Sequence, residues 1–223
     1  VSLARTLSMT LNMRGGGFML VYLSVEQKPI AVDFRSSAPQ NISEDDFLFF
    51  KDNYDQRRYG YKASAVPGTV AGLLQTHKRF GKLSLDQILQ PVIKQAQKGI
   101  RVSYDLNQAI GSAVQINLDE ESQNIYYQKG SPIKEHSVMK RPGLAWTFRE
   151  IAKNGEDAFY KGSIAKKILK AMQQNGGYIS QKDLEDYKPR FAEPIETTYR
   201  NHKVLAHPPP AGGAAVLLEG LNI

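Results

Sequence analysis

Two segments near the start of the chain contain residues that could bind an anionic ligand. Gly15-Gly16-Gly17 could line a site with exposed backbone N–H groups, because glycine lets a backbone approach a ligand closely. Arg35 follows Asp33-Phe34, and its guanidinium could hold a substrate carboxylate through two parallel hydrogen bonds. The plainer alternatives are a turn that leads into a strand for the glycines, and a surface arginine or one paired with Asp33 for Arg35. On the residues alone, the surface arginine is the better interpretation.

Other catalytic chemistries find no support in the sequence. The chain contains no cysteine, which excludes disulfides, thiolate metal sites and a cysteine nucleophile. It has no G-x-S-x-G motif and no phosphate-binding glycine loop ending in Lys-Ser or Lys-Thr. Thr69 is internal, whereas a threonine nucleophile is activated by its own free amine, so we predict that Thr69 starts a helix and bonds a backbone N–H. The histidines lack metal-binding spacing and are predicted to be structural or surface residues: His77, His136, His202 and His207.

The basic charge of the chain is spread along the sequence. A formal charge of +7 and a pI near 9.4 would favour acidic partners, but the basic residues form no cluster larger than pairs such as Lys166-Lys167. Nucleic-acid binders usually carry a concentrated stripe or a recognisable module, so a solvated basic surface with no nucleic-acid partner is expected. The sequence also shows no apolar run that could span a bilayer and no signal-peptide pattern.

The elements that would position the glycines and Arg35 are two strands. Residues 18–25 and 30–34 are rich in Val, Ile, Leu and aromatic residues and are predicted to form a hairpin, with Pro29 at the first position of the second strand. A long polar loop with one helical turn is expected over 36–65, followed by a helix that Pro67 could open.

Helices are predicted for most of the remaining chain. Ser84 and Gln87 form a capping-box pattern before an apolar stripe from Leu85 to Ala96, Gly99 suits the helix end, and Pro91 could kink the helix. A polar loop is expected over 117–137. Further helices are expected at 103–114, 144–153 and 163–174, with a short one at Ser180-Asp183, and a second hairpin at 196–199 and 203–206.

The last residues are apolar after a rigid extended segment at His207–Pro210. The run from Ala211 to Leu221 carries alanine, valine and leucine, and the sequence ends two residues later. Because natural domains seldom end on an uncapped apolar stretch, we expect an incomplete domain that aggregates or oligomerises by itself.

Several stretches, in this order along nearly the whole chain, resemble γ-glutamyltranspeptidases. They are Arg14–Leu20 (RGGGFML), Asp33–Pro39 (DFRSSAP), Val66–Gly72 (VPGTVAG), Leu89–Pro91 (LQP), Gly155–Gly162 (GEDAFYKG), Asn175–Gly177 (NGG) and Pro208–Gly213 (PPPAGG). The resemblance implies an α/β fold that is part of an N-terminal-nucleophile hydrolase, an αββα sandwich, with a mostly helical large-subunit portion and two β-hairpins. Residues 1–223 would be a single incomplete large-subunit domain, truncated at both ends.

The resemblance also implies a function. In that family the N-terminal threonine of a separate small subunit attacks the γ-glutamyl amide of glutathione or a similar donor, without a metal or organic cofactor. The matching position makes Arg35 the residue that binds the α-carboxylate of the γ-glutamyl group, with Gly15, Gly16 and Gly17 as a loop near the substrate. No catalytic residue is expected in this chain, which is predicted to be inactive without its small-subunit partner and to be periplasmic or secreted.

Two departures from the family pattern leave alternatives open. Arg14 stands where the family usually has glycine, and the approach to the glycine loop through Leu7–Leu11 is short. The chain could therefore be an inactive remnant of a truncated gene rather than an enzyme part, with a basic binding module as the third interpretation.

Overall fold

The computed structural model describes residues 15–24, 28–46, 48, 59–113 and 120–223. These residues form a mixed α/β structure in two compact units. The helical unit includes Pro39–Ser64 and Lys82–Glu185, and the hairpin unit includes Met13–Ala38, Ala65–Gly81 and Asp186–Ile223. The approach through Leu7–Leu11 and the departure at Arg14 lie outside the described residues. The expectation of a single incomplete domain stays a prediction.

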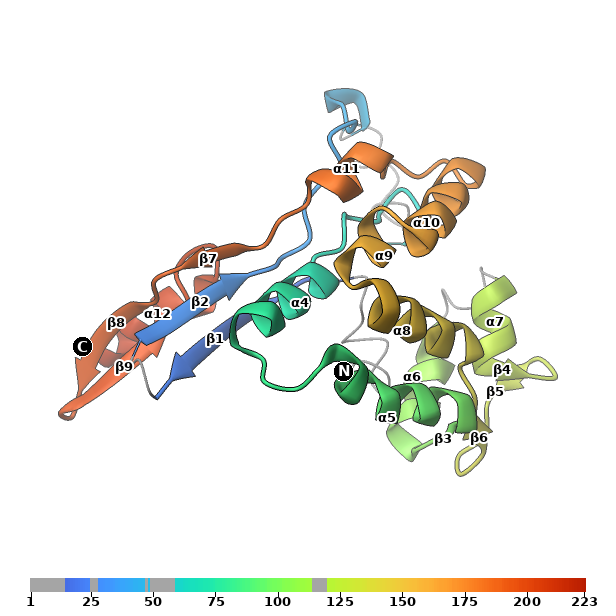
Figure 1. Ribbon diagram of the computed structural model, residues 1–223, viewed down its shortest axis with the longest axis horizontal. Helices are drawn as coiled ribbons and strands as arrows, with labels where there is room; N and C mark the ends of the chain where they lie inside the picture. Colours follow the sequence, from blue (N-terminus) through green and yellow to red (C-terminus); the bar gives the residue numbers. More distant parts are fainter. Residues whose placement is uncertain (1–14, 25–27, 47, 49–58, 114–119) are drawn as a thin grey trace. The chain divides into compact units, whose positions relative to one another are not determined.

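A three-stranded antiparallel sheet organises the hairpin unit (Figure 1). It consists of β1 (Phe18–Leu23), β2 (Lys28–Asp33) and β7 (Arg190–Ala192), with β2 in the middle. The predicted first hairpin is confirmed, with Phe18 opposite Asp33. Pro29 is the second residue of β2 rather than the first, and it is tolerated because β7 pairs only with Ala31–Asp33. Strand β7 was not predicted.

Helix α4 (Thr69–Phe80) follows the glycine-containing segment and packs against β2. Thr69 is the first residue of α4, which confirms that it starts the helix. The N-cap is Gly68 and makes no side-chain cap hydrogen bond, so Pro67 lies before the helix and the expectation that it opens the first turn is wrong. The carbonyl oxygen of Gly15 accepts hydrogen bonds from the backbone N–H groups of Gly68 (2.9 Å) and Thr69 (3.0 Å). A backbone carbonyl thus replaces the side-chain cap at this helix start.

The second predicted hairpin is confirmed as β8 (Ile195–Tyr199) and β9 (His202–Ala206). Its two turn residues, Arg200 and Asn201, both have positive φ, as a two-residue hairpin turn requires.

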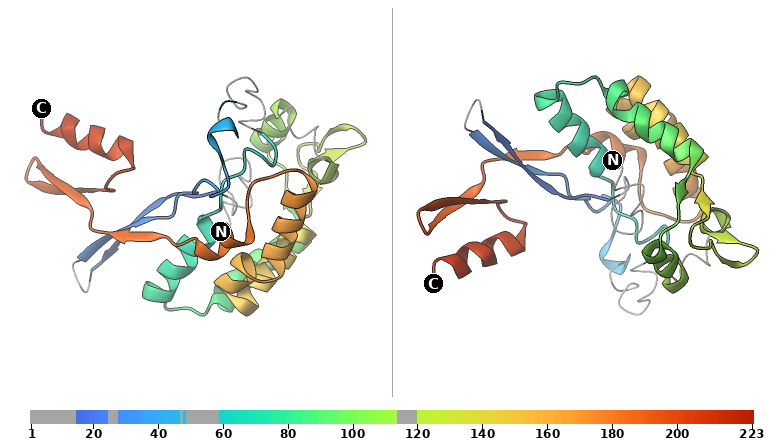
Figure 2. Two further views of the ribbon diagram at one scale, coloured as in Figure 1. Left: turned by 90° about the horizontal axis from the view of Figure 1, so that it is seen from above. Right: turned by 90° about the horizontal axis from the view of Figure 1, so that it is seen from below.

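The predicted extended segment His207–Pro210 is not extended throughout, because Pro209 and Pro210 lie in a turn with a cis peptide bond between them. Figure 2 shows α12 (Gly212–Leu221) beside this hairpin; of its apolar residues Leu218 is buried, whereas Val216 is 69% exposed and Leu217 52%. The expected self-association stays a prediction.

Four helices build most of the helical unit: α5 (Leu85–Lys98), α8 (Pro142–Asn154), α9 (Glu156–Tyr160) and α10 (Ser163–Gln174). The capping box of Ser84 and Gln87 is confirmed, and Gly99 ends α5 with a φ of 94°. Helix α8 starts two residues before the predicted helix, with Pro142 in its first turn, and α10 has the predicted bounds. Helix α9 was not predicted. Buried residues of α5 and α8 face each other: Leu89, Val92, Ile93, Ala96, Ala145, Phe148 and Ile151.

The expectation of a polar loop over 117–137 is wrong. The segment holds α7 (Glu120–Tyr126) and the short hairpin of β4 (Tyr127–Gln128) and β5 (Ser131–Pro132). Ile125, Tyr126 and Tyr127 pack against a core formed by Val102, Leu106, Ile110, Ile133 and Met139. Tertiary burial of these few apolar residues overrides the polar composition of the segment. The same core holds α6 (Tyr104–Ser112), which confirms the predicted helix, and the pair β3 (Ile100–Arg101) and β6 (Val138–Met139).

The predicted start of a helix at Ser180-Asp183 is confirmed by α11 (Gln181–Asp186). The Asp183 carboxylate accepts hydrogen bonds from the backbone N–H groups of Ser180 and Gln40, both at 2.8 Å, and from the Ser180 hydroxyl at 2.6 Å. Residues 44–46 are helical, as expected for the loop over 36–65. The buried Asp183 therefore ties this loop to α11.

Candidate functional site

Arg35 lies directly after β2 and Phe34, and its side chain is exposed. Its backbone N–H donates a hydrogen bond to Oδ1 of Asp33 at 3.0 Å. Its carbonyl oxygen accepts a hydrogen bond from the Tyr187 hydroxyl at 2.7 Å. The backbone of Arg35 is thus held on both sides of its Cα by side chains, although the residue stands at a strand end.

The glycine loop packs against this segment. Gly17 and Phe34 exchange two backbone hydrogen bonds, with N–O distances of 3.2 and 2.9 Å. A Cβ on Gly16 would lie only 2.2 Å from the backbone N of Ser36 and 2.6 Å from the carbonyl C of Arg35. The structure therefore brings the predicted loop and Arg35 together. The N–H of Gly17 already bonds Phe34, so this donor is not an exposed one that a ligand could use.

The start of α4 closes the other side of the Phe34–Arg35 segment. A Cβ on Gly68 would lie 2.0 Å from Oη of Tyr187 and 2.1 Å from the carbonyl oxygen of Phe34. A Cβ on Gly72 would lie 2.3 Å from Cγ of Phe34. Both glycines of the VPGTVAG segment are thus needed for close approach, because any side chain there would displace backbone or ring atoms.

The guanidinium of Arg35 lies over an aromatic ring. Its Cζ is 5.8 Å from the centroid of the Phe18 ring, and the Phe18 ring is 4.5 Å from the ring of His207. Within the described part of the chain, no carboxylate lies within ion-pair distance of Arg35. The alternative of pairing with Asp33 is not seen, because Asp33 accepts the backbone N–H of Arg35 instead. A guanidinium in these surroundings can donate two parallel hydrogen bonds to a carboxylate of a ligand.

His207 is a structural residue, as predicted, and only 7% of it is exposed. Its Nδ1 lies 2.9 Å from the carbonyl oxygen of Pro208, which fits Nδ1–H as the donor. The ring supports Phe18 from β1.

Tyr187 is suited to act as a hydrogen-bond donor at any physiological pH. Burial of its half-buried ring raises its pKa to about 12, and the negative charge of Asp33 adds to this effect. The hydroxyl therefore remains protonated and keeps its bond to Arg35. Sequence reasoning missed Tyr187, since it lies 152 residues from Arg35 and no local pattern marks it.

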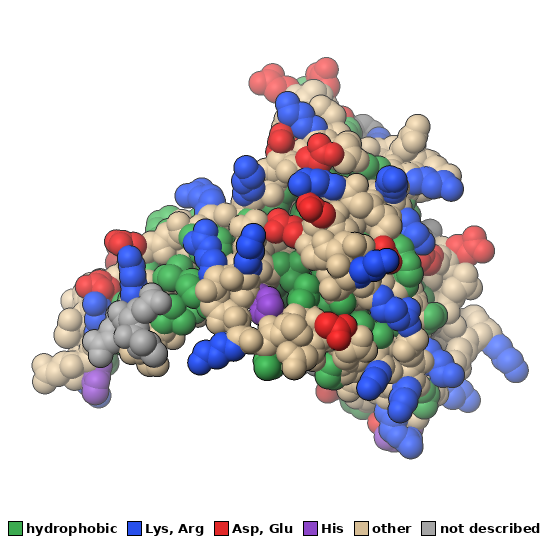
Figure 3. Space-filling model, viewed as in Figure 1, with side chains coloured by type: hydrophobic (Ala, Val, Ile, Leu, Met, Phe, Trp, Pro, Cys, Tyr) green, Lys and Arg blue, Asp and Glu red, His purple; other side chains and the backbone are tan. Residues whose placement is uncertain are grey.

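The chemistry that the Arg35 guanidinium offers is the binding of an anion. An exposed guanidinium on a fixed backbone can hold a carboxylate, but neither nucleophile nor general base stands beside it among the contacts described above. The described residues contain no cluster of His, Asp or Glu that could hold a metal ion. Figure 3 shows lysine and arginine side chains scattered over the visible face, with aspartate and glutamate between them, rather than gathered in one stripe.

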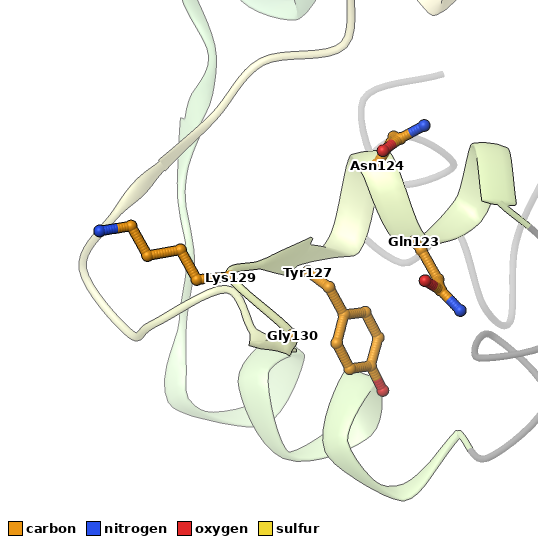
Figure 4. Close-up of a pocket in the computed structure, with 5 residues that line it drawn as sticks. All are labelled: Gln123, Asn124, Tyr127, Lys129 and Gly130. Atoms are coloured by element: carbon orange, nitrogen blue, oxygen red, sulfur yellow. The ribbon is translucent and has the colours of Figure 1, made fainter.

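A pocket in the helical unit is a weaker candidate. It is lined by Gln123, Asn124, Tyr127, Lys129 and Gly130. In Figure 4 the side chains of Gln123 and Tyr127 point to the same side, whereas that of Lys129 points away. The polar groups do not converge on one point, so this pocket offers no defined chemistry.

The fold and the site together define a mixed α/β protein with an exposed arginine on a backbone that two side chains hold. Comparison with known proteins makes this more specific. Residues 3–223 match the family model described as Gamma-glutamyltranspeptidase. The Glutathione hydrolase proenzyme of Escherichia coli (strain K12) is 38% identical over 217 residues, which cover 95% of this chain and 37% of that protein. The proenzyme of the same name from Pseudomonas aeruginosa is 36% identical over 229 residues, covering 100% of this chain and 40% of that protein.

Solved structures agree with these relatives. The crystal structure of Helicobacter pylori gamma-glutamyltranspeptidase matches with a TM-score of 0.92 and 30% identity, over 99% of this chain and 64% of that one. Gamma-glutamyltranspeptidase from Pseudomonas nitroreducens, complexed with L-DON, matches with a TM-score of 0.86 and 34% identity, over 97% of this chain and 64% of that one.

The chain belongs to the γ-glutamyltranspeptidase family. The predicted fold class, α/β and part of an N-terminal-nucleophile hydrolase, is confirmed by these structures. The chain spans 37% and 40% of the length of the two curated relatives named above.

Proposed function

We propose that this chain forms the part of a γ-glutamyltranspeptidase that binds the α-carboxylate of a γ-glutamyl donor such as glutathione, and that Arg35 makes this contact. The observation that carries the proposal is the exposed Arg35 guanidinium, which has no carboxylate within ion-pair distance in the described residues and extends from a backbone fixed by Asp33 and Tyr187. Relatives named glutathione hydrolase proenzyme support the choice of donor.

The reaction would need a nucleophile from the small-subunit portion of the family. The hydroxyl oxygen of its N-terminal threonine would attack the γ-carbonyl carbon, while its own α-amine takes the hydroxyl proton. The C–N bond then breaks, the proton passes to the leaving amine, and a γ-glutamyl ester remains on the threonine. Water or an acceptor amine then attacks the carbonyl carbon of this ester, and the C–O bond to threonine breaks. The proton of the attacking group passes by way of the α-amine to the threonine oxygen, which restores the hydroxyl and releases the γ-glutamyl product. Arg35 would hold the donor through these steps by its α-carboxylate.

Location outside the cytoplasm, periplasmic or secreted, stays a prediction. None of the helices in the described residues combines the length and apolarity needed to cross a membrane.

The chain by itself is predicted to be inactive. Because the proposal assigns binding rather than a nucleophile to these residues, rigorously purified chain should not release p-nitroaniline from γ-glutamyl-p-nitroanilide above the buffer rate. Turnover that copurifies with the chain and persists through successive columns would contradict the assignment.

The binding role is tested by titrating γ-glutamyl-p-nitroanilide into the chain and following ligand NMR signals. Arg35→Gln should weaken binding about 10- to 100-fold, as expected for loss of charge-assisted hydrogen bonds to a carboxylate. Arg200→Gln is the matched control, since Arg200 is also an exposed arginine of the hairpin unit, with its Cζ 5.2 Å from the Tyr199 ring centroid. Equal affinities of the two variants would exclude Arg35 as the carboxylate-binding residue.

A further inference from the structure

We infer that Tyr187 is a positioning residue for Arg35. Its hydroxyl holds the Arg35 carbonyl, and this orients the guanidinium so that it can donate two parallel hydrogen bonds to a γ-glutamyl α-carboxylate. This inference rests on the proposed function. Tyr187 would not touch the substrate and would act on it through Arg35.

The first support is the pair of hydrogen bonds on the two peptide groups that flank the Arg35 Cα. Asp33 accepts the N–H of Arg35 at 3.0 Å, and the Tyr187 hydroxyl donates to the carbonyl oxygen of Arg35 at 2.7 Å. Together they restrict both backbone dihedral angles of a residue that otherwise stands in an irregular segment. Without the second bond, rotation of the Arg35 carbonyl would let the Cα–Cβ direction drift.

The second support is the space made for the Tyr187 hydroxyl. A Cβ on Gly68 would lie 2.0 Å from Oη of Tyr187, so only glycine at the N-cap of α4 lets this hydroxyl reach Arg35. The N–H of Gly68 is in turn bonded to the carbonyl oxygen of Gly15 at 2.9 Å. Tyr187 is therefore seated between the start of α4 and the Arg35 backbone, and the glycine loop fixes that helix start.

The third support is that bidentate recognition depends on geometry. A carboxylate gains two parallel hydrogen bonds from an arginine only when the guanidinium plane meets it at the right angle. The Phe18 ring, 5.8 Å from Cζ of Arg35, restricts the side chain, and Tyr187 restricts the backbone from which it extends. Loss of either restriction should lower the affinity for carboxylate more than the stability of the protein.

The test compares Tyr187→Phe with Tyr199→Phe. Both substitutions remove one tyrosine hydroxyl from the hairpin unit, but none of the hydrogen bonds described for this unit involves the Tyr199 hydroxyl. Each variant is titrated with γ-glutamyl-p-nitroanilide and with its α-carboxamide analogue, in which a neutral amide replaces the carboxylate. Tyr187→Phe should bind the carboxylate ligand about three- to tenfold more weakly than Tyr199→Phe. The two variants should bind the carboxamide equally and should unfold at similar temperatures.

The outcomes separate this inference from the proposed function. If the unmodified chain prefers the carboxylate but the two variants bind it equally, Tyr187 has no positioning role and the role of Arg35 stands. If Tyr187→Phe weakens both ligands equally, its role is structural and the inference fails. If the unmodified chain does not distinguish the ligands, the proposed function fails. Amide hydrogen exchange of Arg35 then decides whether Tyr187 restrains the Arg35 backbone. Exchange about three- to tenfold faster in Tyr187→Phe supports this restraint, and unchanged exchange overturns it.

Discussion

The Gly16→Ala substitution tests whether close packing of the glycine loop holds the Arg35 segment in place. The added Cβ would lie 2.2 Å from the backbone N of Ser36 and 2.6 Å from both Cα and the carbonyl C of Arg35. Ordinary contacts between such atoms are about 3.5–4.0 Å, so the two backbones must separate by more than about 1 Å. Because the clashing atoms belong to the backbone, no side-chain rotation relieves the overlap.

The expected cost follows from this overlap. Overpacking of this kind destabilises proteins by about 1–3 kcal/mol. For a chain of this length that corresponds to a fall of roughly 2–12 °C in the unfolding midpoint. A shift of about 1 Å would also change the angle at which Arg35 meets a carboxylate, so ligand affinity should fall together with stability.

Thermal unfolding followed by circular dichroism measures the first effect, and Gly220→Ala is the matched control. Gly220 lies in α12, and a Cβ added there would meet no neighbouring group within 4 Å. Alanine at this position should therefore stabilise the chain by up to about 1 kcal/mol through helix propensity. If Gly16→Ala unfolded at or above the temperature of the parent chain and left the amide shifts of Arg35 and Ser36 unchanged, the packing argument would be refuted.

Two further predictions concern the groups that hold the loops. The free energy of unfolding should fall as the pH rises from about 10 to about 12, because Tyr187 stays protonated in the folded chain while the unfolded tyrosine ionises. Denaturant titrations should show a smaller fall for Tyr187→Phe, which lacks this hydroxyl. An identical pH profile for the variant and the parent chain would disprove the contribution of Tyr187. Asp183→Ala should destabilise the helical unit by about 2–4 kcal/mol, because the backbone N–H groups of Ser180 and Gln40 lose a charged acceptor. Lys182 is an exposed neighbour, so the control variant Lys182→Ala should change the urea midpoint little. Equal midpoints for these two variants would show that the Asp183 contacts contribute little.

The sequence predicted those elements whose signals are local. The capping box at Ser84, the apolar stripe from Leu85 to Ala96 and the helix end at Gly99 all act within one helix, so the sequence alone predicts them. Strand β7 has three residues and forms only by pairing with β2, more than 150 residues earlier in the chain. Helix α7 depends on the burial of Ile125 and Tyr126 against a distant core, and its polar composition suggested a loop instead.

The candidate site divides in the same way. The segment DFRSSAP resembles the family motif and so predicts a role for Arg35, whereas the residue alone favours an ordinary surface arginine. The glycines were recognised as a loop, but their neighbours were not, since the close approaches of Gly16 to Ser36 and of Gly68 to Tyr187 arise from the tertiary fold. Tyr187 and His207 reach the site from the far end of the chain, and nothing in their local sequence marks them.

The central claim is that Arg35 recognises the α-carboxylate, and the coupling between these two groups tests it most directly. The affinities of the unmodified chain and Arg35→Gln are measured for γ-glutamyl-p-nitroanilide and for its α-carboxamide analogue. The unmodified chain should prefer the carboxylate by about 10-fold or more, and Arg35→Gln should bind both ligands with nearly equal affinity. If Arg35→Gln retained the same preference as the unmodified chain, another group would bind the carboxylate and the account would be wrong.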